Sequence, residues 1–234
     1  MINLDNRLKQ CAEFVSGNGY SVDVGTDHAY LAAYLVSSGI CKKVIACDLR
    51  EGPLESAKKH IHDEGLENKI KTVLSDGLDN IPSDGVTDII IAGMGGELIA
   101  RIISKAEWIK ENKVNLILQP MTKAYELRKF LYENGFSIKC EKAVRSDPFM
   151  YSVINTEYSD NCKKHKDYEI YSGGLDFNVE LDREYLLIQA ERLINAGNSI
   201  MKAEKKTPEL IREGKEKIRL GNIIKDKLNN NRKD

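Results

Sequence analysis

Acidic and glycine-rich segments follow several short apolar runs of this sequence, and their residue types point to a ligand site. The first run, Tyr20–Val24, leads into Gly25-Thr26-Asp27-His28. Gly25 permits a tight turn and a close approach of the backbone to a ligand. Asp27 and Tyr30 replace the later glycines of a dinucleotide fingerprint, and Asp27 would repel a pyrophosphate. A cationic or zwitterionic ligand suits this loop, unless Asp27 only caps the following helix.

Carboxylates after the next two apolar runs could bind the sugar and the base of a nucleoside. Asp48 lies 23 residues beyond Gly25, near the spacing at which an acidic residue accepts hydrogen bonds from ribose hydroxyls. Asp76 precedes Gly77 after the third run and could accept from an adenine amino group. Each has a simpler alternative, since Asp48 can be a solvated strand end and Asp-Gly is common in turns.

Two later segments could form the wall of an acceptor pocket. Ala92-Gly93-Met94-Gly95-Gly96 leaves backbone N–H groups accessible at the start of a helix, and Met94 adds an apolar surface. Gln119-Pro120-Met121 carries a side-chain amide that could read the edge of a base. A flexible turn in the first segment and a plain turn in the second are the alternatives.

Regular elements must bring these segments together. The first helix is expected after Asp5 as its N-cap. Strands are expected at 20–24, 43–47, 70–74, 88–92 and 115–118, with helices near 28–38, 53–64, 97–110 and 124–133. Two strands, 136–144 and 150–156, then follow with only a turn between them. Five βα units and a hairpin predict an open α/β sheet of the Rossmann-like kind with an antiparallel edge, whose ligand lies at the carboxyl ends of the strands.

The last third of the chain has a purely helical pattern. Small and apolar residues recur there at alternating intervals of four and three, a spacing typical of the contact face of a coiled coil. They are Leu186, Ala190, Leu193, Gly197 and Ile200. Thr207-Pro208-Glu209 predicts the start of a second helix. We therefore expect a first domain at residues 1–160 and a helical coiled-coil hairpin at residues 161–234, with the linker in Asp160–Gly174.

The amino-acid composition excludes several classes of protein. Hydrophobic residues make up 41% of the 234 residues and charged residues 30%, which excludes wholesale disorder. The net charge of -1 conceals an asymmetry, because residues 161–234 hold 16 Lys and Arg against 13 Asp and Glu. The five cysteines form no C-x-x-C pair, so neither a disulfide framework nor a zinc site is expected. We find no membrane-length apolar run and no signal peptide, and expect a cytoplasmic monomer.

Taken together, these motifs resemble the TrmK family, the bacterial tRNA (adenine-22-N1)-methyltransferases, which are class I enzymes that use S-adenosylmethionine (SAM). The most specific matches are Asp23–Leu31, Ala92-Gly93-Met94-Gly95-Gly96 and Ile117-Leu118-Gln119-Pro120. The chain departs from the family at Met121, where Asn is usual. The resemblance runs from Arg7 to the hairpin near Val153, and the helical tail agrees with it in position and character.

The resemblance implies a role for each motif position. Residues on the methionine side of SAM are Gly25, Thr26, Asp27, His28 and Tyr30, with Asp23 beside them. Asp48 and Leu49 bind the ribose, Asp76 and Gly77 bind the adenine, and Gly93, Met94 and Gly95 lie near the transferred methyl group. Gln119 and Pro120 border the acceptor pocket.

The reaction that the resemblance implies needs no general base, because the adenine N1 carries a lone pair and no proton. Catalysis can then rest on positioning and electrostatics. The catalytic candidates are Asp27, His28, Met94 and Gln119. His28 has a purely structural alternative in the first turn of a helix. Because N1 lies on the Watson–Crick edge, the target base must be unpaired or flipped out.

Basic side chains in the tail are the candidate tRNA contacts. They are Lys202, Lys205, Lys206 and Arg212, with Arg7 and Arg145 in the first domain. A solvated coiled-coil face is the alternative explanation for the tail. Alternative functions are SAM-dependent methylation of another RNA or a small molecule, a non-catalytic SAM-binding adaptor, and an NAD-dependent oxidoreductase. Missing glycines and the final hairpin disfavour the last.

Overall fold

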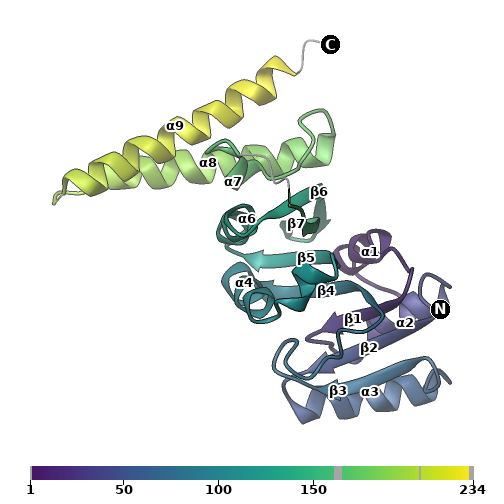
Figure 1. Ribbon diagram of the computed structural model, residues 1–234. Helices are drawn as coiled ribbons and strands as arrows, with labels where there is room; N and C mark the ends of the chain where they lie inside the picture. Colours follow the sequence, from purple (N-terminus) through teal and green to yellow (C-terminus); the bar gives the residue numbers. More distant parts are fainter. Residues whose placement is uncertain (1, 161–164, 206, 232–234) are drawn as a thin grey trace. The chain divides into compact units, whose positions relative to one another are not determined.

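The computed structural model describes residues 2–160, 165–205 and 207–231, and the chain divides into two compact units, Met1–Lys163 and Lys164–Asp234. The first unit contains a seven-stranded sheet in the order β3-β2-β1-β4-β5-β7-β6 (Figure 1). The strands are β1 (Tyr20–Val24), β2 (Lys43–Asp48), β3 (Ile70–Leu74), β4 (Val86–Gly95), β5 (Asn115–Thr122), β6 (Phe136–Ser146) and β7 (Phe149–Tyr158). The first five are parallel, and β7 pairs antiparallel with β5 and β6. The expected Rossmann-like sheet with an antiparallel hairpin is confirmed.

Two apolar layers cover the two faces of this sheet. Successive side chains of β4 point to opposite faces, as the two-residue period of a strand requires. Ile89 and Ile91 therefore lie in one layer and Ile90 lies in the other. The first layer includes side chains of α4 (Gly96–Lys105), α5 (Trp108–Glu111) and α6 (Ala124–Glu133). The second includes those of α1 (Asn6–Glu13), α2 (Tyr30–Ser37) and α3 (Glu51–Asp63). The inner strands β1, β2, β4 and β5 are thus buried on both faces, which explains the continuous apolar run of β4, whereas β3 at the edge of the sheet is only partly buried.

Several boundaries differ from the sequence prediction for local reasons. The helix expected from His28 begins only at Tyr30, because His28 and Ala29 have φ of 54° and 55° and cannot join a right-handed helix. The helix expected at 97–110 is interrupted at Ala106, where ψ is 78°. Residues 75–85 hold turns and no helix, so the sheet has fewer βα units than predicted. The N-cap at Asp5 is confirmed, since its side chain accepts from the N–H groups of Arg7 and Leu8.

A buried ion pair joins α6 to the hairpin. Arg128 is 1% exposed, and its Nε lies 3.2 Å from each carboxylate oxygen of Glu141 on β6. Its Nη2 donates to the same carboxylate and to the Ser152 hydroxyl on β7. Because both charges are removed from water, removing one partner leaves the other buried without its counter-charge.

We therefore predict that Arg128→Met lowers the free energy of unfolding by about 3–5 kcal/mol. The double variant Arg128→Met with Glu141→Leu should recover much of that loss, because it removes both buried charges. Urea unfolding of the three proteins measures the effect. Equal stability of the single variant and the wild type would show that the pair contributes nothing.

The second unit consists of helices alone in its described residues. They are α7 (Glu169–Ser172), α8 (Glu180–Lys202) and α9 (Pro208–Asn230). The last two pack antiparallel, since Gly197 faces Gly214 and the side chain of Arg183 donates to the carbonyl of Leu228. A Cβ atom on Gly197 would lie 2.6 Å from the Gly214 carbonyl oxygen, so this crossing requires glycine. The Thr207 side chain caps α9, as the sequence predicts.

The described residues contain no helix that is long and apolar enough to cross a bilayer. Nor do they contain a group of three or more His, Cys, Asp and Glu side chains arranged to hold a metal ion. Cys11, Cys41, Cys47 and Cys140 are free thiols, and Cys162 lies outside the described residues.

Candidate functional site

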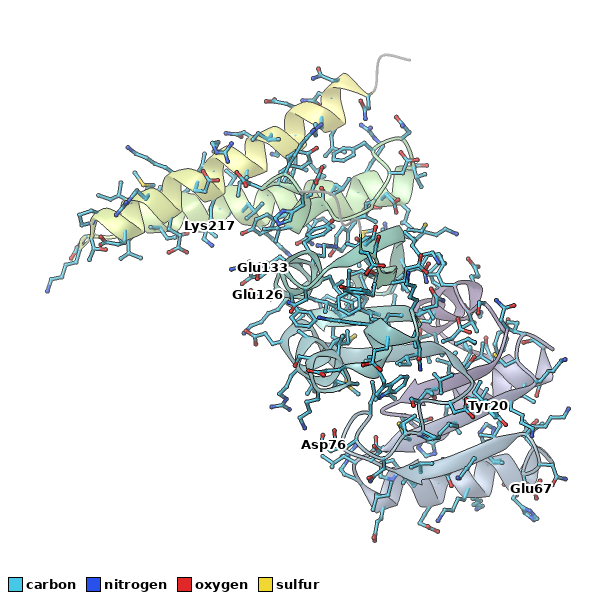
Figure 2. The ribbon with its side chains drawn as sticks, in the orientation of Figure 1. Tyr20, Glu67, Asp76, Glu126, Glu133 and Lys217 are labelled. Atoms are coloured by element: carbon cyan, nitrogen blue, oxygen red, sulfur yellow. The ribbon has the colours of Figure 1, made fainter. Side chains whose placement is uncertain are left out.

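The predicted motif residues of the first unit lie at one edge of the sheet, where the parallel strands end. Asp76 lies at the end of the sheet opposite Tyr20 and Glu67, which mark the amino ends of β1 and β3 (Figure 2). The strand order reverses between β1 and β4, which are neighbours although β2 and β3 separate them in sequence. Ligands of open α/β sheets bind at such a reversal, beyond the carboxyl ends of the strands.

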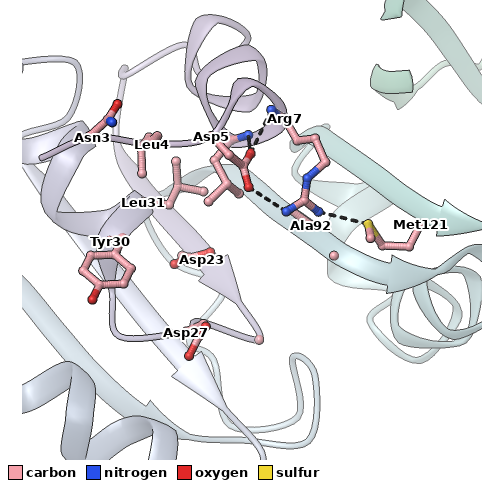
Figure 3. Close-up of a pocket in the computed structure, with 13 residues that line it drawn as sticks. Asn3, Leu4, Asp5, Arg7, Asp23, Asp27, Tyr30, Leu31, Ala92 and Met121 are labelled. Atoms are coloured by element: carbon pink, nitrogen blue, oxygen red, sulfur yellow. Dashed lines mark hydrogen bonds and ion pairs between the residues drawn. The ribbon is translucent and has the colours of Figure 1, made fainter. Parts of the chain in front are cut away.

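A cavity of about 510 Å³ occupies this position (Figure 3). Its wall combines Asp23 and the β1–α2 turn with the Ala92-Gly93 end of β4 and Met121 of β5. The segment Asn3–Leu8 forms a further part of the wall. The volume is sufficient for a small ligand, and the wall carries three carboxylates, Asp5 included, against one guanidinium. The cavity therefore favours a ligand with a positive charge.

Asp23 is the most perturbed carboxylate of the cavity. It is 6% exposed, and burial raises its pKa from 3.8 to about 6, with the charge of Asp48 adding to the rise. A hydrogen bond from the Thr26 hydroxyl, 2.7 Å from Oδ2, opposes the shift. Asp23 is thus a buried anion near neutral pH, which a bound cation would stabilise.

The β1–α2 turn presents the polar groups that the sequence predicts. The N–H groups of Gly25 and Thr26 both donate to the Cys47 carbonyl of β2, which fixes the start of the turn. The side chain of Asp27 is 85% exposed and lies 3.4 Å from His28 Nε2. Tyr30 is 44% exposed and stacks on the His28 ring. The Asp27 carboxylate does not accept the capping hydrogen bond that the alternative requires, because α2 has Ala29 as its N-cap and no side-chain cap.

The nucleoside candidates lie along the same edge. Asp48 ends β2, and its Oδ1 accepts from the Arg50 N–H at 2.8 Å. Leu49 is 63% exposed beside it and offers an apolar surface. Asp76 pairs with Lys105 at 3.4 Å. Gly77 has φ of 59°, and a Cβ atom there would lie 2.9 Å from Ile102.

The glycine-methionine segment and β5 are joined by a buried amide. Gln119 is fully buried, and its Oε1 accepts from the Gly93 N–H at 3.0 Å. Pairing of Met94 with Pro120 and of Gly95 with Thr122 continues the contact. Met94 also reaches the β1–α2 turn, because a Cβ on Gly25 would lie 2.2 Å from its Cε. Gln119 thus positions the segment, and its buried amide does not face the open cavity.

Arg7 completes the site in a way that sequence reasoning missed. Its Nη1 donates to Gln119 Oε1 at 3.2 Å. The same nitrogen donates to Met121 Sδ at 2.9 Å, and Nη2 pairs with Asp5 at 2.6 Å (Figure 3). The guanidinium also lies over the Tyr151 ring, 5.5 Å from its centroid. These partners place Arg7 in the cavity wall. A phosphate contact, as the sequence predicts, would have to compete with them.

The other candidate RNA contacts lie elsewhere in the chain. Arg145 is on β6, and its carbonyl accepts from the Asn6 side chain. Lys202 and Lys205 are exposed at the end of α8 and just beyond it. Arg212 is exposed on α9 and pairs with Glu209 at 3.4 Å. Lys206 lies outside the described residues.

The comparison with protein families defines the class. Residues 4–154 match the family model described as a methyltransferase domain, and this range holds six strands of the sheet and the first half of β7. The chain therefore contains a methyltransferase domain.

Individual relatives define the family within that class. A tRNA (adenine(22)-N(1))-methyltransferase of Bacillus subtilis is 33% identical over 174 residues, which are 74% of this chain and 73% of the relative. The crystal structure of the B. subtilis m1A22 tRNA methyltransferase TrmK has a TM-score of 0.85 at 26% identity and covers 97% of this chain and 100% of its own. A Streptococcus pneumoniae protein solved with S-adenosyl-L-methionine has a TM-score of 0.77 at 32% identity, covering 95% and 98%. The chain belongs to the TrmK family, as the resemblance of its motifs implies.

The Asp23 environment generates a prediction for stability. Its folded-state pKa lies above the ordinary value of 3.8, so the folded protein binds this proton more tightly than the unfolded chain does. The free energy of unfolding therefore falls as pH rises through the window from 3.8 to about 6. We expect Asp23→Asn to be more stable than the wild type by about 2–3 kcal/mol above about pH 7, with no difference below about pH 4.

Urea unfolding of both proteins at the two pH values measures this difference. Asn can still accept the Thr26 hydrogen bond, so the comparison isolates the buried charge. A stability difference that is the same at both pH values would contradict the assignment.

Proposed function

We propose that this chain transfers the methyl group of SAM to N1 of adenosine 22 of a tRNA. The observation that carries the proposal is the acidic cavity at the β1/β4 reversal, bordered by the Gly93 turn, in a chain of the TrmK family. A sulfonium cation fits an enclosure that contains Asp23 and Asp27, whereas a pyrophosphate does not. A tRNA substrate also implies that the protein acts in the cytoplasm.

The cofactor residues follow from this placement. The β1–α2 turn, with Asp23 below it, surrounds the methionine part through Gly25, Thr26, Asp27, His28 and Tyr30. Asp48 accepts from the ribose hydroxyls, and Leu49 packs on the sugar and the base. Asp76 and Gly77 border the adenine. Gly93, Met94 and Gly95 then lie beside the methyl group, since Met94 contacts Gly25.

The residues of the chain act by positioning and charge. When bound, SAM would supply an electrophilic methyl group to the lone pair of N1, with the sulfur leaving as a neutral thioether and the positive charge passing to the base. No side chain has to remove a proton from N1. Asp27 stabilises positive charge on the base, but it accelerates the reaction only as far as that interaction exceeds its interaction with the reactant sulfonium. His28 and Met94 shape the contact between the two reactants.

The acceptor side of the cavity is formed by β5 and the N-terminal segment. Gln119 accepts a hydrogen bond from the Gly93 N–H and donates one to the Pro120 carbonyl. Arg7 donates to both Gln119 and Met121. Met121 offers a thioether where the family usually has an amide, so this wall is less polar than the family pattern implies. An unpaired adenine can enter beside this wall.

The helical unit serves as the tRNA-binding arm. We assign α8 and α9 to a coiled-coil hairpin within residues 161–234, and residues 1–160 to the catalytic domain. Basic side chains gather near the connection of the two helices, with Lys202 and Lys205 exposed there. Such cations supply phosphate contacts that do not depend on sequence.

Mass-spectrometric mapping of a tRNA transcript after incubation with SAM tests the proposal. We expect 1-methyladenosine at position 22 and none at other adenosines. Tight SAM binding without methyl incorporation would instead favour a non-catalytic adaptor. Methylation of a different nucleotide would overturn the substrate assignment.

The Asp48 assignment predicts the behaviour of one variant. Asp48→Ala removes a carboxylate that accepts from the ribose, so SAM affinity should fall about 10- to 100-fold, as for lost charged hydrogen bonds. Calorimetric titration with SAM measures this. Asp84→Ala removes an exposed carboxylate at the amino end of β4 and is the matched control. Unchanged affinity of the Asp48 variant would show that the site is misplaced.

The arm assignment predicts a separable effect on tRNA binding. Lys202→Glu with Lys205→Glu should weaken tRNA binding. The slope of log K against log salt concentration should also fall in magnitude by about one to two, because each lost phosphate contact lowers it by about 0.7–0.9. SAM affinity should not change. Lys69→Glu with Lys71→Glu is the matched charge reversal, on exposed residues at the amino end of β3. If both pairs weaken binding equally, the arm is not the specific contact.

A further inference from the structure

The β1–α2 turn contains an unfavourable backbone that its own sequence does not explain. His28 and Ala29 are consecutive non-glycine residues with φ of 54° and 55°. Left-handed backbone costs an L-residue roughly 1–2 kcal/mol and occurs mainly where the surroundings impose it. The turn separates Asp27 from Tyr30, and both of these side chains line the cavity. Its geometry therefore sets the positions of two cofactor candidates.

The start of this turn is fixed by β2, but its second half needs another contact. The Cys47 carbonyl binds the N–H groups of Gly25 and Thr26. Beyond Thr26, the N–H of Tyr30 lies 3.5 Å from the Asp27 carbonyl, at the limit of a hydrogen bond. Ala29 is the N-cap of α2, and no side chain caps this helix. Something outside the turn must hold the left-handed pair.

His60, on the neighbouring helix α3, makes that contact. Its Nδ1 lies 2.8 Å from the His28 carbonyl oxygen. A carbonyl only accepts, so Nδ1 carries the hydrogen and donates it. The same ring meets the Tyr30 ring edge-on, with centroids 4.8 Å apart. His60 thus binds the residues on both sides of Ala29, and its side chain is only 19% exposed.

We propose that His60 is a positioning residue for the cofactor site, which holds the His28–Ala29 turn in its left-handed form so that Asp27 and Tyr30 face the cavity. The inference rests on the proposed SAM site. It adds α3 to the elements that shape this site, although no sequence motif on α3 indicates such a role. His60 acts through the turn and lies outside the set of residues that line the cavity.

The two contacts of His60 can be separated by substitution. His60→Asn keeps an N–H donor at the position of Nδ1 and removes the ring. His60→Phe keeps a ring against Tyr30 and removes the donor, and His60→Ala removes both. His62 is the matched control, because it lies on the same helix with a 77% exposed side chain and pairs with Glu67. His62→Phe therefore changes the same residue type without touching the turn.

Calorimetric SAM titration and steady-state kinetics with the full chain and a tRNA substrate test the proposal. We expect His60→Phe and His60→Ala to weaken SAM binding about tenfold, the value of one lost hydrogen bond, with His60→Asn and His62→Phe within about threefold of the wild type. The KM for SAM should rise accordingly, while the KM for tRNA stays unchanged. Amide exchange of residues 27–31 should accelerate in the two donor-less variants alone.

The outcomes that overturn the inference differ from those that overturn the proposed function. A wild-type protein that binds no SAM refutes the proposed function. A wild type that binds SAM, with His60→Ala or His60→Phe binding it equally well, refutes the role of His60. If kcat and the thermal midpoint fall in all His60 variants while their SAM affinity and their KM for SAM stay unchanged, the residue is merely structural. His60→Ala decides the question if the larger Phe ring prevents folding.

Discussion

The reversal of winding between β1 and β4 is the constraint on which the rest of this structure depends. After β1 the chain moves outward through β2 and β3, and it must then return to the other side of β1 to lay down β4 and β5. The connections leaving β1 and β4 therefore diverge, and a cavity remains between them. This topology brings Asp23 and the Gly93 turn to the two sides of the cavity, although 70 residues of sequence separate them.

Contacts that cross this cavity are made by buried polar groups. Gln119 accepts from Gly93 and Arg7 with a single oxygen, so one amide links β4, β5 and α1. The charge of Arg7 is balanced by Asp5, which leaves Asp23 and Asp27 as the acidic groups that set the sign of the cavity. Low exposure strengthens these interactions, because water competes less for buried donors and acceptors. The site is thus linked by hydrogen bonds on the β5 side and negative on the β1 side.

Sequence patterns predicted most of the fold and the edge of the sheet at which the cavity lies. Apolar runs located β1 and β3, and the helix expected at 124–133 has the bounds of α6, since these elements follow local rules. Non-local effects explain the errors. His28 and Ala29 have no local reason to leave the helix, and their conformation depends on His60, 32 residues away from His28. Arg7 looks like a free cation in sequence, and its bond to Gln119 spans 112 residues.

The glycine contact between α8 and α9 has a consequence for how the helical unit behaves as a whole. Glycine within a helix lowers helix propensity by about 1 kcal/mol relative to alanine, so Gly197 and Gly214 weaken each helix taken alone. Glycine permits contact between the two backbones. The stability of the pair therefore depends on the interface more than on the individual helices. Neither helix can fray far without releasing the other. The pair therefore melts cooperatively, and a ligand bound near its connection acts on both helices at once.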